Sequence, residues 1–141
     1  MKTTLLPFLI LINLTSSIYS QDKASVSIHI DITSTKFNKG SVLIALYESE
    51  ESYMKDIYKS ADVPVKDNKA QFTFQSLKKG VYAFSFFHDL NNNKKFDTNF
   101  LGIPKEPYGF SNDKKGRFGP PKFSEASLKI NKNSSFKISI E

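Results

Sequence analysis

Several short stretches of the chain alternate between apolar and polar residues, which is the pattern of β-strands that bury one face. In residues 25–32, valine or isoleucine occupies every second position, and similar alternation runs through residues 70–75 and 136–141. Residues 42–47 are instead continuously apolar, which predicts a central strand covered on both faces. The chain is therefore predicted to fold mainly as β-sheet.

Two polar turns are predicted to fold pairs of strands into hairpins. The first turn, residues 77–80, separates the strand at 70–75 from another at 81–87. The second turn, residues 131–134, lies between two alternating stretches near the C-terminus, at residues 128–130 and 136–140.

Residues 48–60 differ in character, because their apolar side chains stand at helix-like spacing; they predict a short amphipathic helix or a structured crossover. With hardly any other helical pattern, about seven short strands predict an all-β fold. We expect a single β-sandwich, immunoglobulin-like or prealbumin-like (transthyretin-like), with one long structured loop. The spacing of Leu77, Gly80 and Tyr82 is similar to a turn common in transthyretin-like and collagen-adhesin B-type sandwiches.

The N-terminus has the order of a secretory signal peptide: a lysine at position 2, an apolar run over residues 5–14, and a mostly polar stretch ending at Ser20. We expect residues 1–20 to be removed and residues 21–141 to form one domain, periplasmic or extracellular. The apolar run is too short to span a bilayer, so no transmembrane segment is predicted after cleavage. Because the chain has no cysteine, its core or an ion must stabilise the exported domain.

The formal net charge of +6 favours anionic partners such as phosphate-bearing glycans or lipid headgroups. Export argues against nucleic acid. The alternative is that scattered lysines only keep the protein soluble, so charge alone does not identify a partner.

Oxygen-bearing side chains recur at calcium-loop spacing just after the predicted strand at 81–87. Asp89, Asn91, Asn93 and Asp97 take the first, third, fifth and ninth positions, and Lys95 at the seventh offers its backbone carbonyl. The sixth and twelfth positions lack the glycine and glutamate of an EF-hand, so a Ca²⁺ site here would have modest affinity. The alternative is an asparagine-rich turn that binds no ion.

The connection from residue 89 to about residue 124 is longer than most loops and is rich in proline, glycine and aromatic residues. We expect it to be ordered, with Lys105, Glu106 and Tyr108 as a partner-binding surface. The alternative is that its aromatic rings fold back over the end of the sandwich as a satellite core. These rings are Phe96, Phe100, Tyr108, Phe110, Phe118 and Phe123.

Three stretches of this connection carry a family resemblance when they are taken together. They are His88-Asp89-x-Asn91-x-Asn93, residues 97–111 apart from position 107, and Phe118-Gly119-Pro120-Pro121-x-Phe123. They closely resemble domain of unknown function family 2141, and the similarity covers nearly all of the exported chain. The resemblance implies a small exported bacterial protein with a β-sandwich and no established reaction. It also implies a glycine where this chain has Lys94.

Two kinds of function fit these patterns. A hydrolase-type enzyme would use His88 and Glu106, with Ser111 as a further candidate. However, His88 and Asp89 point to opposite faces of a strand and cannot form a hydrogen-bonded dyad, which favours a structural role for His88. With two histidines and no cysteine, a closed structural zinc site is excluded. We therefore expect a non-catalytic binding or accessory module whose calcium-stabilised loop presents a surface to a glycan, an envelope polymer or a protein.

Overall fold

The computed structural model describes residues 25–34, 37–116 and 119–140. Strands make up 50% of it and helices 6%, which confirms the predicted all-β class. The predicted signal peptide and Phe118 lie outside the described residues. No helix in the described part of the chain is long and apolar enough to cross a membrane.

The described strands are β1 (Val26–Ser34), β2 (Ser41–Tyr47), β3 (Lys59–Pro64), β4 (Lys69–Leu77), β5 (Gly80–Asp89), β6 (Tyr108–Phe110), β7 (Leu128–Ile130) and β8 (Ser134–Ile140). A 3₁₀ helix (Ser111–Asp113) and α1 (Phe123–Ala126) lie between β6 and β7.

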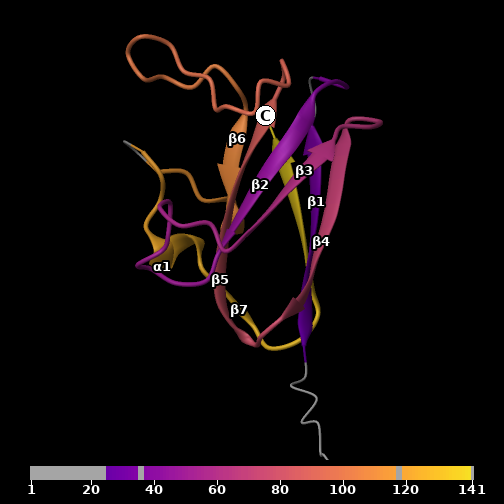
Figure 1. The fold of residues 1–141 in the computed structure, drawn as a ribbon, viewed down its shortest axis with the longest axis vertical. Helices are drawn as coiled ribbons and strands as arrows, with labels where there is room; N and C mark the ends of the chain where they lie inside the picture. The colour runs from indigo at the N-terminus through magenta and orange to yellow at the C-terminus, as the bar shows by residue number, and fades with distance from the viewer. Residues whose placement is uncertain (1–24, 35–36, 117–118, 141) are drawn as a thin grey trace, which may run out of the picture.

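The strands form two sheets packed as a β-sandwich (Figure 1). The three-stranded sheet has the order β4-β1-β8, with β4 antiparallel and β8 parallel to β1. In the five-stranded sheet the order is β3-β2-β5, and both β6 and β7 pair with β5. Because β6 pairs with residues 85–87 and β7 with residues 80–82, the two short strands share one edge of β5.

The core lies between the sheets and consists of the inward positions of each strand. Ile28, Ile30 and Ile32 of β1 are fully buried, in agreement with the alternation of the sequence. They share one apolar cluster with the inward side chains of the other sheet, among them Ile44 of β2 and Phe84 of β5. Burial of one such side chain contributes about 1.5–3 kcal/mol, so these strands are a firm support for the loops at their ends.

Both predicted hairpins are wrong, because each turn carries the chain from one sheet to the other. β4 pairs with β1 in the three-stranded sheet, whereas β5 pairs with β2 in the five-stranded sheet. In the same way, β7 pairs with β5 and β8 pairs with β1. Alternation identifies which side of a strand is buried, but it does not identify the neighbour with which the strand pairs.

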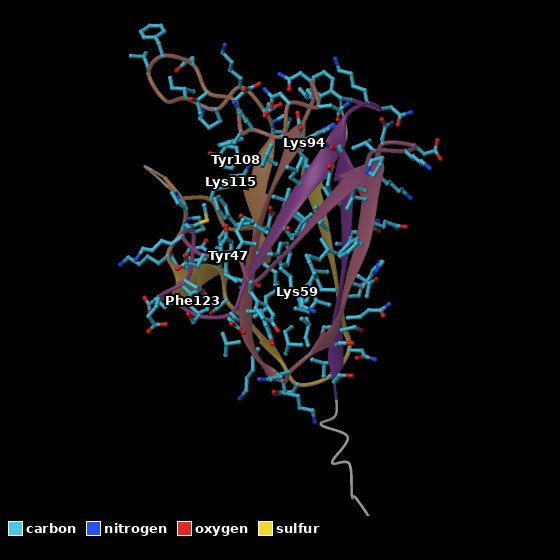
Figure 2. All side chains as sticks on the ribbon, viewed as in Figure 1. Tyr47, Lys59, Lys94, Tyr108, Lys115 and Phe123 are labelled. Carbon is cyan, nitrogen blue, oxygen red and sulfur yellow. The ribbon has the colours of Figure 1, made fainter. Side chains whose placement is uncertain are left out.

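The crossover between β2 and β3 consists of consecutive turns, so the amphipathic helix considered for residues 48–60 does not form. Ser49 Oγ accepts the N–H of Ser52 at 3.2 Å and holds the first turn. Met54 has a φ of 58°, which lies outside the right-handed helical region. Tyr53 packs edge-on against Tyr47 and Phe123, both labelled in Figure 2, and this small apolar cluster fixes the crossover.

Candidate functional site

The loop that follows β5 is folded back on itself by the carboxylate of Asp89. Asp89 is fully buried at the end of β5. Its Oδ1 accepts the N–H of Asn93 at 3.1 Å, and its Oδ2 accepts the N–H of Lys94 at 2.8 Å. Charge-assisted hydrogen bonds of this kind are among the stronger ones in proteins. Asp89 therefore fixes the first turn of the loop.

The predicted calcium ligands Asp89, Asn91, Asn93, Lys95 and Asp97 are called the ladder here. The side chains of Asn91, Asn93 and Asp97 meet at one point. Asn91 Nδ2 donates to Asp97 Oδ2 at 2.8 Å, and Asn93 Nδ2 lies 3.1 Å from each Asp97 oxygen. The amide oxygens accept backbone N–H groups two residues ahead, from Asn93 at 3.1 Å and from Lys95 at 2.9 Å. These are Asx turns, and they direct alternate residues of the loop toward Asp97.

A cation in this loop would depend on oxygen ligands alone. Among the described residues, no three His, Cys, Asp or Glu side chains gather into a metal-binding group. The candidate ligands therefore remain two carboxylates, Asp89 and Asp97, the amide oxygens of Asn91 and Asn93, and the carbonyl of Lys95.

Glu106 ties the two ends of the ladder together. Its side chain is buried, with Oε1 accepting the N–H of Leu90 and Oε2 accepting the N–H of Asp97, both at 3.0 Å. Both carboxylate oxygens are thus engaged with the backbone of its own loop. Lys105 and Tyr108, the other residues expected at a partner surface, are exposed on either side of it.

His88 lies on the inner face of β5 and is fully buried. Its Nε2 lies 2.6 Å from the carbonyl oxygen of Lys39, so Nε2 carries the proton and donates. Its backbone N–H donates to the carbonyl of Pro107 at 2.8 Å. His88 thus joins the end of β5 to the turn before β2 and to the segment before β6, which is a structural role.

Ser111 is a buried cross-link between three segments. Its Oγ accepts the N–H of Phe84 at 3.0 Å and donates to the carbonyl of Ala126 at 2.5 Å. In the described structure, no hydrogen bond joins Ser111, His88 and Glu106 to one another. The three residues considered for hydrolysis therefore serve three separate structural contacts.

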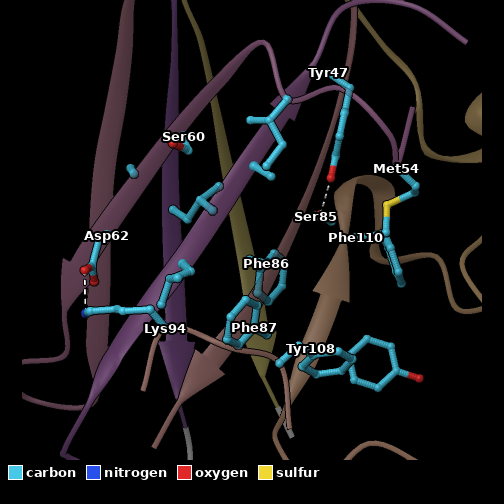
Figure 3. A pocket seen from close by; sticks show the side chains of 16 residues that line it. Tyr47, Met54, Ser60, Asp62, Ser85, Phe86, Phe87, Lys94, Tyr108 and Phe110 are labelled. Carbon is cyan, nitrogen blue, oxygen red and sulfur yellow. Dashed lines mark hydrogen bonds and ion pairs between the residues drawn. The ribbon is translucent and has the colours of Figure 1, made fainter. Parts of the chain in front are cut away.

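The outer face of the five-stranded sheet is hollowed into an apolar cleft of about 510 Å³ (Figure 3). Its floor consists of two rows of side chains that cross β3, β2, β5 and β6 in that order. Small residues at the centre of the second row leave space, and the rings at the β6 end of the two rows border it. The first row is Asp62, Leu43, Phe87 and Tyr108, and the second is Ser60, Ala45, Ser85 and Phe110.

Two loops form the rim of the cleft. Met54 and Ile57 come from the crossover between β2 and β3, and Lys94 and Phe96 come from the loop after β5. The Phe96 ring packs against that of Phe87, with centroids 5.3 Å apart. The loop held by Asp89 therefore supplies one wall of the cleft.

Polar groups lie at opposite ends of the cleft, as Figure 3 shows. At one end, Lys94 Nζ lies 2.5 Å from Asp62 Oδ2, and this hydrogen bond lowers the pKa of the Asp62 carboxyl. At the other end, the hydroxyl of Tyr47 lies 3.3 Å from Ser85 Oγ. The floor between these ends is mainly apolar.

The sequence from residue 30 to residue 138 matches the family described as "Uncharacterized protein conserved in bacteria (DUF2141)". The chain belongs to this family. Neither a curated protein nor a solved structure matches the chain. Membership in DUF2141 therefore confirms the resemblance carried by the loop residues.

Within this DUF2141 chain, position 94 has the backbone conformation that favours glycine. Lys94 has a φ of 62°, a left-handed value that is unfavourable for residues with a Cβ atom. This conformation explains why the resemblance implies a glycine there. In this chain the lysine side chain gains the ion pair with Asp62 instead.

Sequence reasoning about this DUF2141 member missed the cleft. Leu43 and Ala45 belong to the apolar run at residues 42–47, which was interpreted as covered on both faces. Both are in fact only partly buried, and their side chains line the cleft. The available signal was the apolar outward positions themselves.

Proposed function

We propose that this protein is an exported, non-catalytic binding module that takes its ligand in the cleft on the five-stranded sheet. The observation that carries this function is the apolar outward row formed by Leu43, Phe87 and Tyr108. Outward positions of an antiparallel sheet are polar when they face water. A concave apolar site of about 300–1,000 Å³ with a few polar groups is the usual form of a small-molecule site. The pattern of residues 1–20 supports a periplasmic or extracellular location.

The ligand that fits best is a neutral and largely apolar molecule. Asp62 and Lys94 are the charged residues that line the cleft, and they neutralise each other. An ionised ligand would lose hydration there without meeting an unpaired opposite charge. A glycan would bring many hydroxyl groups to a floor that offers few partners. The hydroxyls of Tyr47, Ser60 and Ser85 suit a ligand with one or two polar atoms.

Calcium has a supporting place in this function, because the candidate ion loop is also the rim of the cleft. The convergence of Asn91 and Asn93 on Asp97 supports it. For their oxygens to face an ion beside Asp97, the two amides must turn over and release the N–H groups that they accept in the Asx turns, so the ion would replace these turns in holding the loop. Such an ion would fix the backbone that carries Lys94 and Phe96 into the cleft.

A neutral fluorescent probe tests the cleft. N-phenyl-1-naphthylamine should bind to the protein with enhanced, blue-shifted emission. Phe96→Ala removes a ring from the wall and should weaken binding about tenfold. Phe100→Ala is the matched control, since it removes the same ring from the same loop at a position outside the cleft.

A second variant separates loss of the site from loss of the fold. Ala45→Leu fills the floor of the cleft from β2 and should also weaken probe binding, while thermal melting verifies that each variant is folded. If the probe binds wild type, Phe96→Ala and Ala45→Leu with equal affinity, the cleft is not the binding site.

A further inference from the structure

The loop after β5 ends in an exposed apolar tip, defined here as residues 100–103. Phe100 is 94% exposed, Leu101 68% and Ile103 55%. In Figure 1 this loop stands clear of both sheets at the end of the sandwich where β5 terminates. Contiguous exposed apolar residues at such a position mark a contact with another surface.

The tip is a closed turn with its own hydrogen bonds. Asn99 Oδ1 accepts the N–H groups of Leu101 at 2.9 Å and Ile103 at 3.0 Å. The backbone N–H of Asn99 donates to Ile103 at 2.9 Å, and Gly102 supplies the left-handed residue with a φ of 77°. Four backbone N–H groups of the turn are therefore satisfied within it, while the apolar side chains of the tip are exposed.

Phe100 differs from the other aromatic residue of this loop. Phe96 packs against Phe87 and Tyr108, with ring centroids 5.3 and 5.4 Å away. Phe100 lies beyond this stack, and a Cβ atom added at nearby Gly102 would meet nothing within 4 Å. The satellite core expected from the sequence thus includes Phe96 but leaves out Phe100.

Cationic side chains surround the base of the tip. Lys95 and Lys105 are exposed in the two loop segments that lead into and out of the tip. Lys105 also lines a hollow together with Lys115 and Pro104. The carboxylates of Asp97 and Glu106, on the same loop, accept hydrogen bonds from amide groups within it. Glu106 is buried and Asp97 is partly buried, whereas Lys95, Lys105 and Lys115 are exposed, so the exposed charge near the tip is positive.

We infer that the apolar tip inserts into the interfacial region of a lipid bilayer that carries anionic headgroups. Phe100, Leu101 and Ile103 leave water for the boundary between headgroups and acyl chains, while Lys95 and Lys105 meet the headgroup charge. One small turn with a basic collar suits this shallow, reversible contact. A protein partner would need a matching apolar pocket with acidic rims.

Co-sedimentation with vesicles tests the contact. The purified protein should sediment with phosphatidylcholine vesicles that contain about one third phosphatidylglycerol, and much less with phosphatidylcholine alone. The double variant Phe100→Ser, Leu101→Ser should lower the partition coefficient at least about tenfold, and Lys105→Gln about fivefold. Val81→Ser is the control, since Val81 is an exposed apolar residue near the start of β5, away from the tip. All variants share the same N-terminal residues, so any lipid binding by that segment contributes equally to each and does not affect the ratio of their partition coefficients.

Two results would overturn the inference. One is equal sedimentation of the double serine variant and the wild type. The other is a dimer, seen by light scattering, that the double variant converts to a monomer, which would assign the tip to a second copy of the chain. Binding of N-phenyl-1-naphthylamine by the double variant should equal that of wild type. The probe therefore tests ligand binding in the cleft, and sedimentation tests lipid binding by the tip, independently of each other.

Discussion

The outer faces of the two sheets have opposite character. On the three-stranded sheet, every residue of the two central outward rows is polar. On the five-stranded sheet, the corresponding rows carry leucine, alanine, phenylalanine and tyrosine beside the polar residues Asp62, Ser60 and Ser85. The polar rows are Thr73, His29, Ser135 and Gln71, Asp31, Lys137; the apolar positions are Leu43, Ala45, Phe87, Tyr108 and Phe110.

This difference shows where the molecule is specialised, because both faces obey the same two-residue alternation. Apolar surface left in water forfeits about 25 cal/mol for each Å². A sheet whose only task was to close the core would carry polar residues outward, as β1 and β8 do. On the face with Leu43 and Phe87, a bound ligand would remove apolar surface from water, and this favours binding there.

The largest effect should come from the edge of the apolar face, where Asp89 holds the rim loop. Asp89→Ala leaves the N–H groups of Asn93 and Lys94 without their acceptor. Hydrogen bonds to a charged group contribute about 1.5–3 kcal/mol each, so we expect the free energy of unfolding in urea to fall by about 3 kcal/mol. Gln71→Ala is the control on the polar face, because Gln71 is exposed there. Its effect should stay below about 0.5 kcal/mol; equal losses would contradict the role of Asp89.

Calcium should stabilise the rim of the apolar face. For a dissociation constant of about 1 mM, about 10 mM calcium raises the free energy of unfolding by about 1.4 kcal/mol. Thermal melting of chelator-treated protein, with magnesium as control, measures this shift. Asp97→Asn should abolish it. An unchanged melting temperature in wild type would leave the ladder as a purely structural turn.

Two substitutions at position 94 distinguish the effect of backbone strain from the effect of the ion pair at the end of the cleft. Lys94→Ala loses the contact with Asp62 and keeps the left-handed backbone, whereas Lys94→Gly loses the contact and relieves the strain. We expect the glycine variant to be more stable in urea than the alanine variant by about 1 kcal/mol. Equal stability would show that the loop adapts its backbone to the residue at this position.

The smallest effect should come from Tyr53, beneath the other rim loop. Its hydroxyl is buried without a hydrogen-bond partner in the described structure, so Tyr53→Phe should raise stability at neutral pH by about 0.5 kcal/mol. Burial, with smaller effects of Tyr47 and Glu125, raises the pKa of Tyr53 from 10.0 to about 12.

The same substitution should change the alkaline pH dependence. Between pH 10 and about 12 the folded state keeps the Tyr53 proton while the unfolded chain releases it, so stability falls as pH rises through this window. The advantage of Tyr53→Phe should therefore grow from about pH 9 to about pH 11 in denaturation experiments. A constant difference would place the hydroxyl in contact with solvent.

The sequence predicted the fold class because alternation reports burial directly, as in Ile28, Ile30 and Ile32. It did not predict strand pairing, because a strand with one apolar face can bury that face against the core from either of the two sheets. β3 was missed for a related reason. Only Ala61 and Val63 of that strand face the core, and a strand with two inward apolar residues has little periodic signal.

The loop residues show the same limit at the level of single side chains. The residues at calcium-loop spacing, Asp89, Asn91, Asn93 and Asp97, lie in an ordered polar turn, and calcium binding there stays a prediction. Glu106 was expected at the surface, as part of a partner-binding loop, but it is buried. Its partners, the N–H groups of Leu90 and Asp97, lie 16 and 9 residues away and leave no local pattern to find.

The parallel pairing of β1 with β8 has a consequence for how the chain reaches this structure. The contact between Ser27 and Asn133 joins residues that are 106 positions apart. Closing so long a loop is entropically costly, and such pairings slow folding. Until β8 arrives, one edge of β1 keeps its backbone groups unpaired and open to other strands. We therefore expect the addition of β8 to β1 to be a late step of assembly, although the cleft lies on the other sheet.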